Sequence, residues 1–334
     1  MTQTRRTALS RLWVAALGAP LFAAAPFVST SALAQTEITV QHALPLNSHY
    51  GAGAAALKEN FERLTSGRYR VTEQRNDNER EMVESVQIGT LDCTVTSTGP
   101  VGNFVSEVRV LDVPFLFRNT AHARGVLDGE IGQGLLARFS SRGLAGVAWM
   151  ENGFRHLTNS RHEVHVPADV QGLKVRTMEN PVHMRAFSTL GALPTPMAFS
   201  ELVPALQQGT VDGQENPIGV IVANNLNQVQ RYLTLTGHVY SPAILICNPA
   251  MLARMTPADR AHFMTAAKAA ATANRDRVTE DVNNGVAELR RRGMIVTTEV
   301  DTAAFQASLA PAFAVYEREL DGALLRRIRD WHAQ

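Results

Sequence analysis

Residues 37–72, EITVQHALPLNSHYGAGAAALKENFERLTSGRYRVT, decide the class of fold. Apolar and polar residues alternate over 37–41, as they do in a half-buried β-strand. A helix is then predicted from Ser48, a plausible N-cap, to the stop signal Gly67. Alternation returns at 69–72, which predicts a second strand. The stretch therefore predicts a strand–helix–strand unit.

The same order continues through the next thirty residues or so. Residues 78–92 (NEREMVESVQIGTLD) predict a helix closed by Gly89, and residues 93–100 (CTVTSTGP) predict a strand that runs into a turn. A strand–helix–strand–helix–strand order predicts a parallel sheet with right-handed crossovers. Ligands on such sheets bind at the carboxyl ends of the strands.

A similar pattern restarts in the second half of the chain. Residues 143–155 (GLAGVAWMENGFR) and 172–178 (GLKVRTM) each predict a strand followed by a loop. Helices are predicted at 180–191 and 199–213, and another apolar strand lies within 240–252. No Pro/Ser-rich linker separates the halves, so we expect strands, rather than a flexible tether, to connect two α/β units.

A long helix is predicted after the last apolar strand. Thr256 is its expected N-cap, Pro257 takes the first helical position, and Gly293 ends it. Gly285 is the single helix breaker in between. Such a helix is roughly 50 Å long at 1.5 Å per residue. Because this exceeds the size of one unit, we expect it to brace both.

Length and composition fit a globular protein of two domains. The chain has 334 residues, of which 45% are hydrophobic and 19% are charged. Its formal net charge is +1, and it has no block of Lys or Arg. Nucleic acid and anionic membranes are therefore not expected partners.

The first 34 residues predict a secretory signal peptide. Basic residues, including Arg5 and Arg6, precede an apolar stretch that ends in an Ala-Leu-Ala cleavage motif. A membrane anchor is the alternative, but Pro20 and Pro26 interrupt the apolar run. The paired arginines leave twin-arginine export open beside the Sec route. The predicted location is the periplasm.

Two cysteines, Cys93 and Cys247, lie in apolar strand-like runs. A disulfide requires Cα atoms within about 7 Å, which spacing in the sequence does not establish. We favour two buried free thiols and keep a disulfide as the alternative.

Enzyme motifs are absent. The sequence has no G-x-S-x-G, no G-x-x-x-x-G-K, no G-x-G-x-x-G and no H-E-x-x-H. Its ten histidines are scattered, and His238 and Tyr240 have no paired carboxylate nearby in the sequence. We therefore expect no catalytic residues, no metal and no cofactor.

Three polar residues instead predict a carboxylate site in the second half. Arg155 follows ENGF at an expected strand-to-loop junction, Arg176 ends the next strand, and Asn216 follows a tight turn at Gly213. An arginine fork offers two parallel donors to a carboxylate, and Asn adds another. For each arginine the alternative is a salt bridge to a local acid.

Longer motifs bring a family resemblance. ENGFRHLTNSR, GLKVRTMENP and LGALPTPMAFSELVPALQQGTVDGQENP, all within residues 151–217, closely resemble the DctP-type solute-binding proteins of tripartite ATP-independent periplasmic (TRAP) transporters. Weaker features, such as HALPLNSHYGAGAAALKENFERLTSGRYRV, EREMVESVQIGTLDCTVTSTGP and DVPFLFRN, extend the similarity over most of the chain after residue 34.

This resemblance implies a two-lobe α/β periplasmic-binding-protein fold, of type II-like architecture. Each lobe would be a mixed sheet flanked by helices, with the ligand cleft between the lobes and the long helix bracing both. Lobe I would comprise residues 35–152 and 242–281, and lobe II residues 153–241 and 282–334.

The resemblance also implies roles for single residues. Arg176 matches the arginine that clamps the ligand carboxylate, and Arg155 matches a second arginine near it. Asn216, in QENP, matches an asparagine that hydrogen-bonds the same group, and Phe199 matches an aromatic residue that packs against the ligand.

Further ligand-binding positions follow in the same way. Ser97 and Thr98 lie at the end of the third strand, where family members have pocket residues. The loop after the first strand, around His42 to Ser48, would close over the ligand. Glu179 and Asn180 follow the clamp and would read ligand hydroxyls, with a solvated loop as the alternative.

One segment departs from the family pattern. A glycine-containing turn usually precedes the helix that starts here near Glu79, whereas residues 73–81 read EQRNDNERE. Asn and Asp tolerate turn conformations, but the pocket wall formed by this segment is expected to differ.

The function implied is transport without a chemical step. The protein would capture a small organic acid in the periplasm and deliver it, as a monomer, to the small and large TRAP membrane subunits. The alternatives are a periplasmic sensor that presents the same ligand to a receptor and a secreted enzyme on this fold. Because Glu179 is expected near the site, we favour a hydroxylated, aromatic or keto monocarboxylate over a dicarboxylate.

Overall fold

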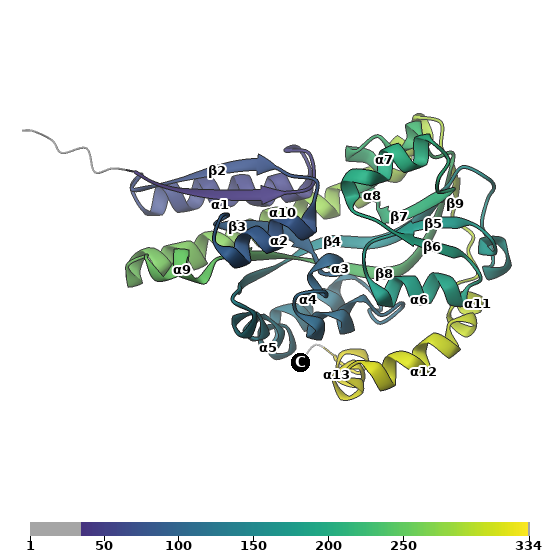
Figure 1. Ribbon diagram of the computed structural model, residues 1–334. Coiled ribbons are helices and arrows are strands. Elements are labelled where there is room, and N and C mark those ends of the chain that lie inside the picture. Colours follow the sequence, from purple (N-terminus) through teal and green to yellow (C-terminus); the bar gives the residue numbers. More distant parts are fainter. Residues whose placement is uncertain (1–34, 333–334) are drawn as a thin grey trace, which may run out of the picture. The chain divides into compact units, whose positions relative to one another are not determined.

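The computed structural model describes residues 35–332, whose strands form one mixed sheet (Figure 1). The sheet has nine strands in the described part of the chain, in the order β2-β1-β3-β8-β4-β7-β5-β6, with β9 beside β8. Their bounds are β1 Thr36–His42, β2 Tyr69–Arg75, β3 Cys93–Ser97, β4 Ala145–Asn159, β5 Lys174–Thr177, β6 Leu193–Pro196, β7 Gly213–Pro217, β8 Tyr232–Cys247 and β9 Ile295–Thr297.

Helices flank this sheet along its whole length. The α-helices are α1 His49–Leu64, α2 Glu79–Ile88, α3 Thr98–Val101, α4 Thr120–Asp128, α5 Glu130–Ala137, α6 Pro181–Thr189, α7 Phe199–Gln207, α8 Ile218–Ala223, α9 Pro249–Ala253, α10 Pro257–Arg291, α11 Thr302–Ser308, α12 Ala310–Glu319 and α13 Gly322–Arg329. Short 3-10 helices are η1 Ser106–Asp112, η2 Arg138–Arg142, η3 Pro167–Val170 and η4 Leu226–Gln228.

The N-terminal unit has the predicted parallel arrangement. β1 pairs in parallel with β2 on one side and with β3 on the other. Ile38 and Val40 alternate into the core, at 1% and 0% exposure, as the pattern in β1 predicts. The Ser48 hydroxyl accepts the Gly51 N–H and caps α1 as expected.

Two long antiparallel strands connect the parallel groups. β8 has 16 residues and pairs with β3 and β4, and β4 has 15 residues and pairs with β8 and β7. Beyond β7, the short strands β5 and β6 are parallel again. The expectation that strands connect the two units is met by β4 and β8.

The expected end of β4 was wrong. We predicted a strand-to-loop junction at Arg155. Gly153 does adopt a φ of 112°, which favours glycine, and the register shifts between Glu151 and Gly153. Pairing then resumes, since Arg155 lies opposite Pro217 of β7 and Val239 of β8. Arg155 is therefore inside a central strand.

The long helix α10 spans Pro257–Arg291, with the predicted cap at Thr256. It contacts α1 and β4, and also α8 and β9 near the other end of the sheet. Its glycine lies at the contact with α8: a Cβ on Gly285 would come within 2.3 Å of the Ile218 side chain. Close helix packing therefore explains the one helix breaker.

The free-thiol interpretation of the cysteines was wrong. Cys93 and Cys247 form a disulfide, with Cα atoms 4.0 Å apart. The antiparallel register of β3 and β8 places these two residues directly opposite each other. A pairing across a sequence separation of 154 depends on that register.

The predicted signal peptide, residues 1–34, lies outside the described residues. Within residues 35–332, no helix is long and apolar enough to cross a membrane.

Candidate ligand-binding site

Arg176 is buried at the predicted strand end. It lies in β5 and is 2% exposed. Its Nε and Nη2 atoms both donate to the Met197 carbonyl oxygen, at 3.1 and 2.7 Å. Among residues 35–332, Nη1 has no hydrogen-bond acceptor and no carboxylate pairs with the guanidinium. Burial, and secondarily Arg155, lowers the pKa of Arg176 to about 10. The charge is therefore held in an unfavourable environment.

A small cavity of about 20 Å³ lies at Arg176. Its polar lining residues come from α1, α2, β3, β4, β5 and β7, and are Tyr50, Glu79, Ser97, Asn152, Arg176 and Asn216. Its apolar lining residues are Ala43, Leu44, Met178, Phe199 and Val220. A second hollow of about 10 Å³ shares Glu79, Arg176, Met178 and Phe199 with this cavity. A cavity of this size has room for about one water molecule.

Arg155, expected as a second arginine near the ligand carboxylate, is paired with Glu215. It is 0% exposed and does not line the cavity. Nε lies 2.5 Å from Glu215 Oε2, and Nη2 lies 2.8 Å from Glu215 Oε1. Burial alone would raise the pKa of Glu215, but Arg155 and two histidines outweigh it and hold that pKa below its usual range. The salt-bridge alternative is therefore the observed state of Arg155.

Two histidines share the Glu215 carboxylate. His238 Nε2 is 3.1 Å from Oε2, and His183 Nδ1 is 3.9 Å from Oε1. Our expectation that His238 has no paired carboxylate was therefore wrong. Only β4 separates β8, which carries His238, from β7, which carries Glu215, so the two side chains meet. Burial lowers the pKa of His183 to about 3, although Glu215 opposes this.

Asn216 connects the ion pair to the cavity. It lies within β7, not after a turn, and it lines the cavity. Its Oδ1 accepts from Arg155 Nη2 at 3.1 Å, and its Nδ2 donates to Gln214 Oε1 at 2.5 Å. Because β7 lies between β4 and β5, Arg155, Asn216 and Arg176 come together as predicted.

Phe199 lies beside Arg176 at the cavity. It is the first residue of α7 and lines both small hollows. The Arg176 Cζ atom is 5.9 Å from the centre of its ring, within cation–π range.

The two candidates where β3 meets α3, Ser97 and Thr98, have different surroundings. Ser97 lines the cavity, and its backbone N–H donates to Glu79 Oε1 at 2.9 Å. Thr98 does not line the cavity, because its hydroxyl donates to the buried Asp112 carboxylate at 2.7 Å. Burial raises the pKa of Asp112 to about 6.

The remaining candidates lie outside the main cavity. Glu179 lines the smaller hollow, and Arg80 Nη1 lies 3.8 Å from its carboxylate. Asn180 caps α6 and donates to Asp112 at 2.7 Å. His42 is fully buried and bonds Glu73 at 2.7 Å, while its neighbours Ala43 and Leu44 line the cavity.

Sequence reasoning missed three polar lining residues: Tyr50, Glu79 and Asn152. Glu79 was noticed only as the start of a helix, and Tyr50 only as part of α1. Asn152 lies at the irregularity before Gly153, which we interpreted as a loop. Only Asn152 carried a signal in the sequence, as a polar residue directly before Gly153.

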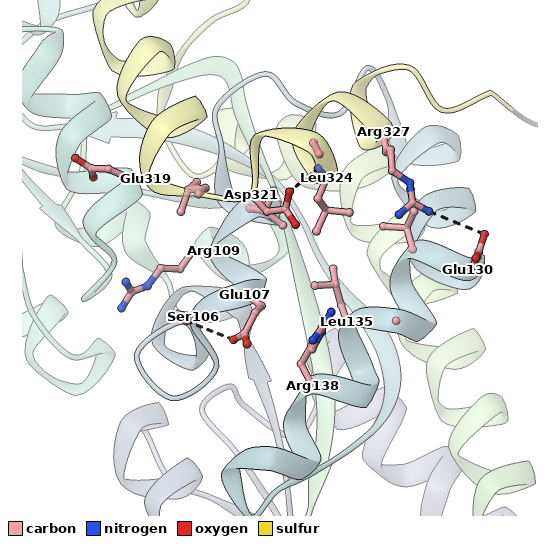
Figure 2. Close-up of a pocket in the computed structure, with 15 residues that line it drawn as sticks. Ser106, Glu107, Arg109, Glu130, Leu135, Arg138, Glu319, Asp321, Leu324 and Arg327 are labelled. Carbon is pink, nitrogen blue, oxygen red and sulfur yellow. Dashed lines mark hydrogen bonds and ion pairs between the residues drawn. The ribbon is translucent and has the colours of Figure 1, made fainter.

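A larger hollow of about 470 Å³ lies elsewhere, between η1, α5 and α12–α13 (Figure 2). Arginines and acids both line it, and some already pair: Arg327 lies 3.9 Å from Glu130. This hollow therefore lacks a converging set of one charge. Among residues 35–332, no group of three or more His, Cys, Asp or Glu side chains is placed to hold a metal ion.

Comparison with known proteins shows what the chain resembles. The family model described as bacterial extracellular solute-binding protein, family 7 (DctP), matches residues 40–319. A solute-binding protein of Verminephrobacter eiseniae is 51% identical over 302 residues, which is 90% of each chain.

Solved structures agree in fold. A TRAP periplasmic solute-binding protein from Polaromonas sp. JS666, bound to D-erythronate, is 48% identical with a TM-score of 0.88 over 90% of this chain and 100% of that one. A Bordetella bronchispeptica counterpart with density assigned to pantoate has the same identity, TM-score and coverage. The predicted resemblance and the two-lobe α/β fold are thereby confirmed.

Proposed function

Because this chain belongs to the bacterial extracellular solute-binding proteins of family 7, we propose that it captures a small hydroxylated monocarboxylate for TRAP-type uptake. One observation carries the proposal: Arg176 is a buried guanidinium that lines a cavity and has no carboxylate partner among the described residues. A ligand carboxylate would supply the missing charge, with the arginine fork and Asn216 as its donors.

Two features support a hydroxylated monoacid over a diacid. The D-erythronate and pantoate of the two related structures are both four-carbon-chain acids with hydroxyls and a single carboxylate. In this chain the Glu79 carboxylate lies in the same cavity as Arg176. A second ligand carboxylate would meet that negative charge, whereas a hydroxyl donates to it.

The cavity must widen for such a ligand to enter. Its volume is about 20 Å³, far less than D-erythronate, with nine non-hydrogen atoms, requires. Contacts beside the cavity join the two predicted lobes. Lobe I comprises 35–152 and 242–281, and lobe II comprises 153–241 and 282–334. Asn103 donates to the Glu179 carbonyl at 2.7 Å, and Asn180 donates to Asp112 at 2.7 Å. We propose that these contacts break when the lobes open and reform over the ligand.

The energies are adequate for tight binding. A micromolar ligand requires about 8 kcal/mol, and charge-assisted hydrogen bonds contribute about 1.5–3 kcal/mol each. Closure around the ligand excludes water and strengthens each of these bonds. Two bonds from Arg176 and one from Asn216 would therefore supply much of the affinity.

Delivery follows from the family. The closed, loaded form would dock on the small and large TRAP membrane subunits and release its ligand, without a chemical step. Family members are periplasmic, and we propose that residues 1–34 direct export, by the Sec or the twin-arginine route. The relatives named above give no support to the sensor alternative.

A thermal-shift screen of the purified protein against small organic acids tests this function. A ligand present at a hundred times its Kd adds about 2.7 kcal/mol of stability. We expect shifts with hydroxylated monocarboxylates, including D-erythronate, that disappear in Arg176→Ala. Shifts with dicarboxylates alone, or with no acid, would contradict the proposed ligand class.

A further inference from the structure

The wall of the cavity contributed by α1 and β4 carries polar groups that the carboxylate clamp does not use. Tyr50, in the first turn of α1, and Asn152, in β4, both line the cavity. They are 1% and 6% exposed. Neither residue belongs to the predicted site, and neither contacts Arg176 through a hydrogen bond.

The Tyr50 hydroxyl is buried without a partner. Among residues 35–332, its oxygen has no hydrogen-bond donor or acceptor. Burial, reinforced by Glu79, raises the pKa of Tyr50 well above its ordinary value, so the group remains a neutral O–H donor. A buried hydroxyl without a partner costs free energy that a ligand oxygen can recover.

The Asn152 amide is oriented by an adjacent histidine. His49 Nε2 lies 3.0 Å from Asn152 Oδ1, so with Nε2 as donor the amide oxygen is occupied. The amide NH₂ is then left for the cavity. On the other side of the ring, His49 Nδ1 lies 3.8 Å from Asp281 in α10. Burial would raise the pKa of Asp281, but His49 and Arg277 hold it below its usual value, which keeps it a carboxylate.

We propose that Tyr50 and Asn152 are specificity-determining residues that donate hydrogen bonds to hydroxyl oxygens of the ligand, and that His49 is the positioning residue for the Asn152 amide. This inference rests on the proposed function, since it assumes that the carboxylate binds at Arg176.

The chemistry of the wall explains why it selects hydroxyls. Tyr50 and Asn152 offer donors. Glu79 in the same cavity offers an acceptor, because its Oε1 accepts from Thr96 and Ser97, whereas its Oε2 accepts no bond from residues 35–332. A hydroxyl both accepts and donates, and so satisfies both kinds of group. An alkyl chain leaves them unpaired in a desolvated site, which such sites reject strongly.

Calorimetric titration with D-erythronate and with butanoate, which has the same chain without hydroxyls, tests the inference. We expect Tyr50→Phe and Asn152→Leu to weaken D-erythronate binding by about 3- to 10-fold each. Binding of butanoate should be unchanged. Tyr240→Phe is the matched control, because the Tyr240 hydroxyl is also buried and unpartnered but does not line the cavity.

The positioning role has its own readout. His49→Phe should reduce the preference for D-erythronate over butanoate, and His49→Gln, whose amide can still donate to Asn152, should restore it. A purely structural role for His49 would lower the affinity for both acids alike.

The possible outcomes separate this inference from the proposed function. If the wild type binds D-erythronate but Tyr50→Phe and Asn152→Leu bind both acids like the wild type, or lose both equally, the inference is wrong and the proposed function stands. If the wild type binds neither D-erythronate nor any other acid, both are wrong.

Discussion

Arg155 and Arg176 are buried in one sheet, at 0% and 2% exposure, but their surroundings are opposite. Arg155 has a carboxylate partner, Glu215, bonded through two of its nitrogens. Among residues 35–332, the only hydrogen-bond acceptor of Arg176 is the Met197 carbonyl oxygen. The strand between them, β7, carries both Glu215 and Asn216.

The comparison indicates that the charge of Arg155 stabilises the fold, whereas the charge of Arg176 is available to a ligand. A buried ion pair is costly to break, because removal of one partner leaves the other charge uncompensated. A buried charge without a counter-ion is already uncompensated, and an anionic ligand would relieve it. Substitution of Arg155 should therefore lower the stability of the fold, whereas substitution of Arg176 should weaken ligand binding.

The largest expected effect is on the paired side. Glu215→Gln leaves Arg155 without a counter-ion, so we expect the free energy of unfolding to fall by about 3–5 kcal/mol. Urea unfolding of the ligand-free protein measures this. Glu84→Gln, which breaks an exposed pair with Arg80, is the control and should have no resolvable effect. A Glu215→Gln protein as stable as the wild type would contradict the structural role of this pair.

The next effect is a pH dependence of the paired region, through His183. Its pKa is 6.5 in the unfolded reference and about 3 when folded, where burial is the first cause. Below about pH 6.5 the unfolded state therefore takes up a proton at His183 that the folded state does not. The free energy of unfolding falls by up to about 1.4 kcal/mol for each unit that the pH is lowered. Urea unfolding at a series of pH values should show this loss become shallower in His183→Gln.

Besides burial, the titratable and charged groups that act on His183 are Glu215, Arg155, His238 and Arg176. The exposed His332 provides a control, since His332→Gln should leave the pH profile unchanged. An unaltered profile in His183→Gln would show that this histidine does not titrate on unfolding.

A smaller effect is expected beside Arg176. Phe199→Leu removes a cation–π contact of about 0.5–1 kcal/mol. Affinity for D-erythronate should therefore fall by about 2- to 5-fold, as read by calorimetry, with little change in unfolding. A loss of more than about 100-fold would mean that Phe199 contacts the ligand more extensively than it contacts Arg176.

The smallest expected effect on stability, that of Arg176→Met, distinguishes the two arginines most clearly. Arg176→Met removes a charge that has no carboxylate partner within residues 35–332, so the ligand-free protein should keep its unfolding free energy within about 1 kcal/mol of the wild type. Arg155→Met should instead be strongly destabilising. Equal losses for the two variants would remove the distinction between them.

Local patterns predicted much of the fold, and their limits have physical causes. Alternation and caps were sufficient for β1, α1 and α10, because each depends on neighbouring residues. The strand β4 was predicted too short, because its continuation past Gly153 depends on pairing with the distant strands β7 and β8. The Cys93–Cys247 disulfide depends on the register of β3 against β8, which no local pattern contains.

The site was predictable to a similar degree. Arg176 ends a strand as expected, and Arg155 and Asn216 lie nearby because β4, β7 and β5 are neighbours. The pairing of Arg155 with Glu215 was missed, because 60 residues separate them. Tyr50 and Asn152 were missed because their proximity depends on how α1 packs beside the irregularity in β4.

Calorimetric titration of D-erythronate into the wild type and Arg176→Lys tests the central claim most directly. Lysine keeps the charge but loses the planar fork. We expect the wild type to bind and Arg176→Lys to lose at least about 30-fold in affinity, or about 2 kcal/mol. Equal affinity in the two proteins would contradict the assignment of Arg176 as the carboxylate clamp.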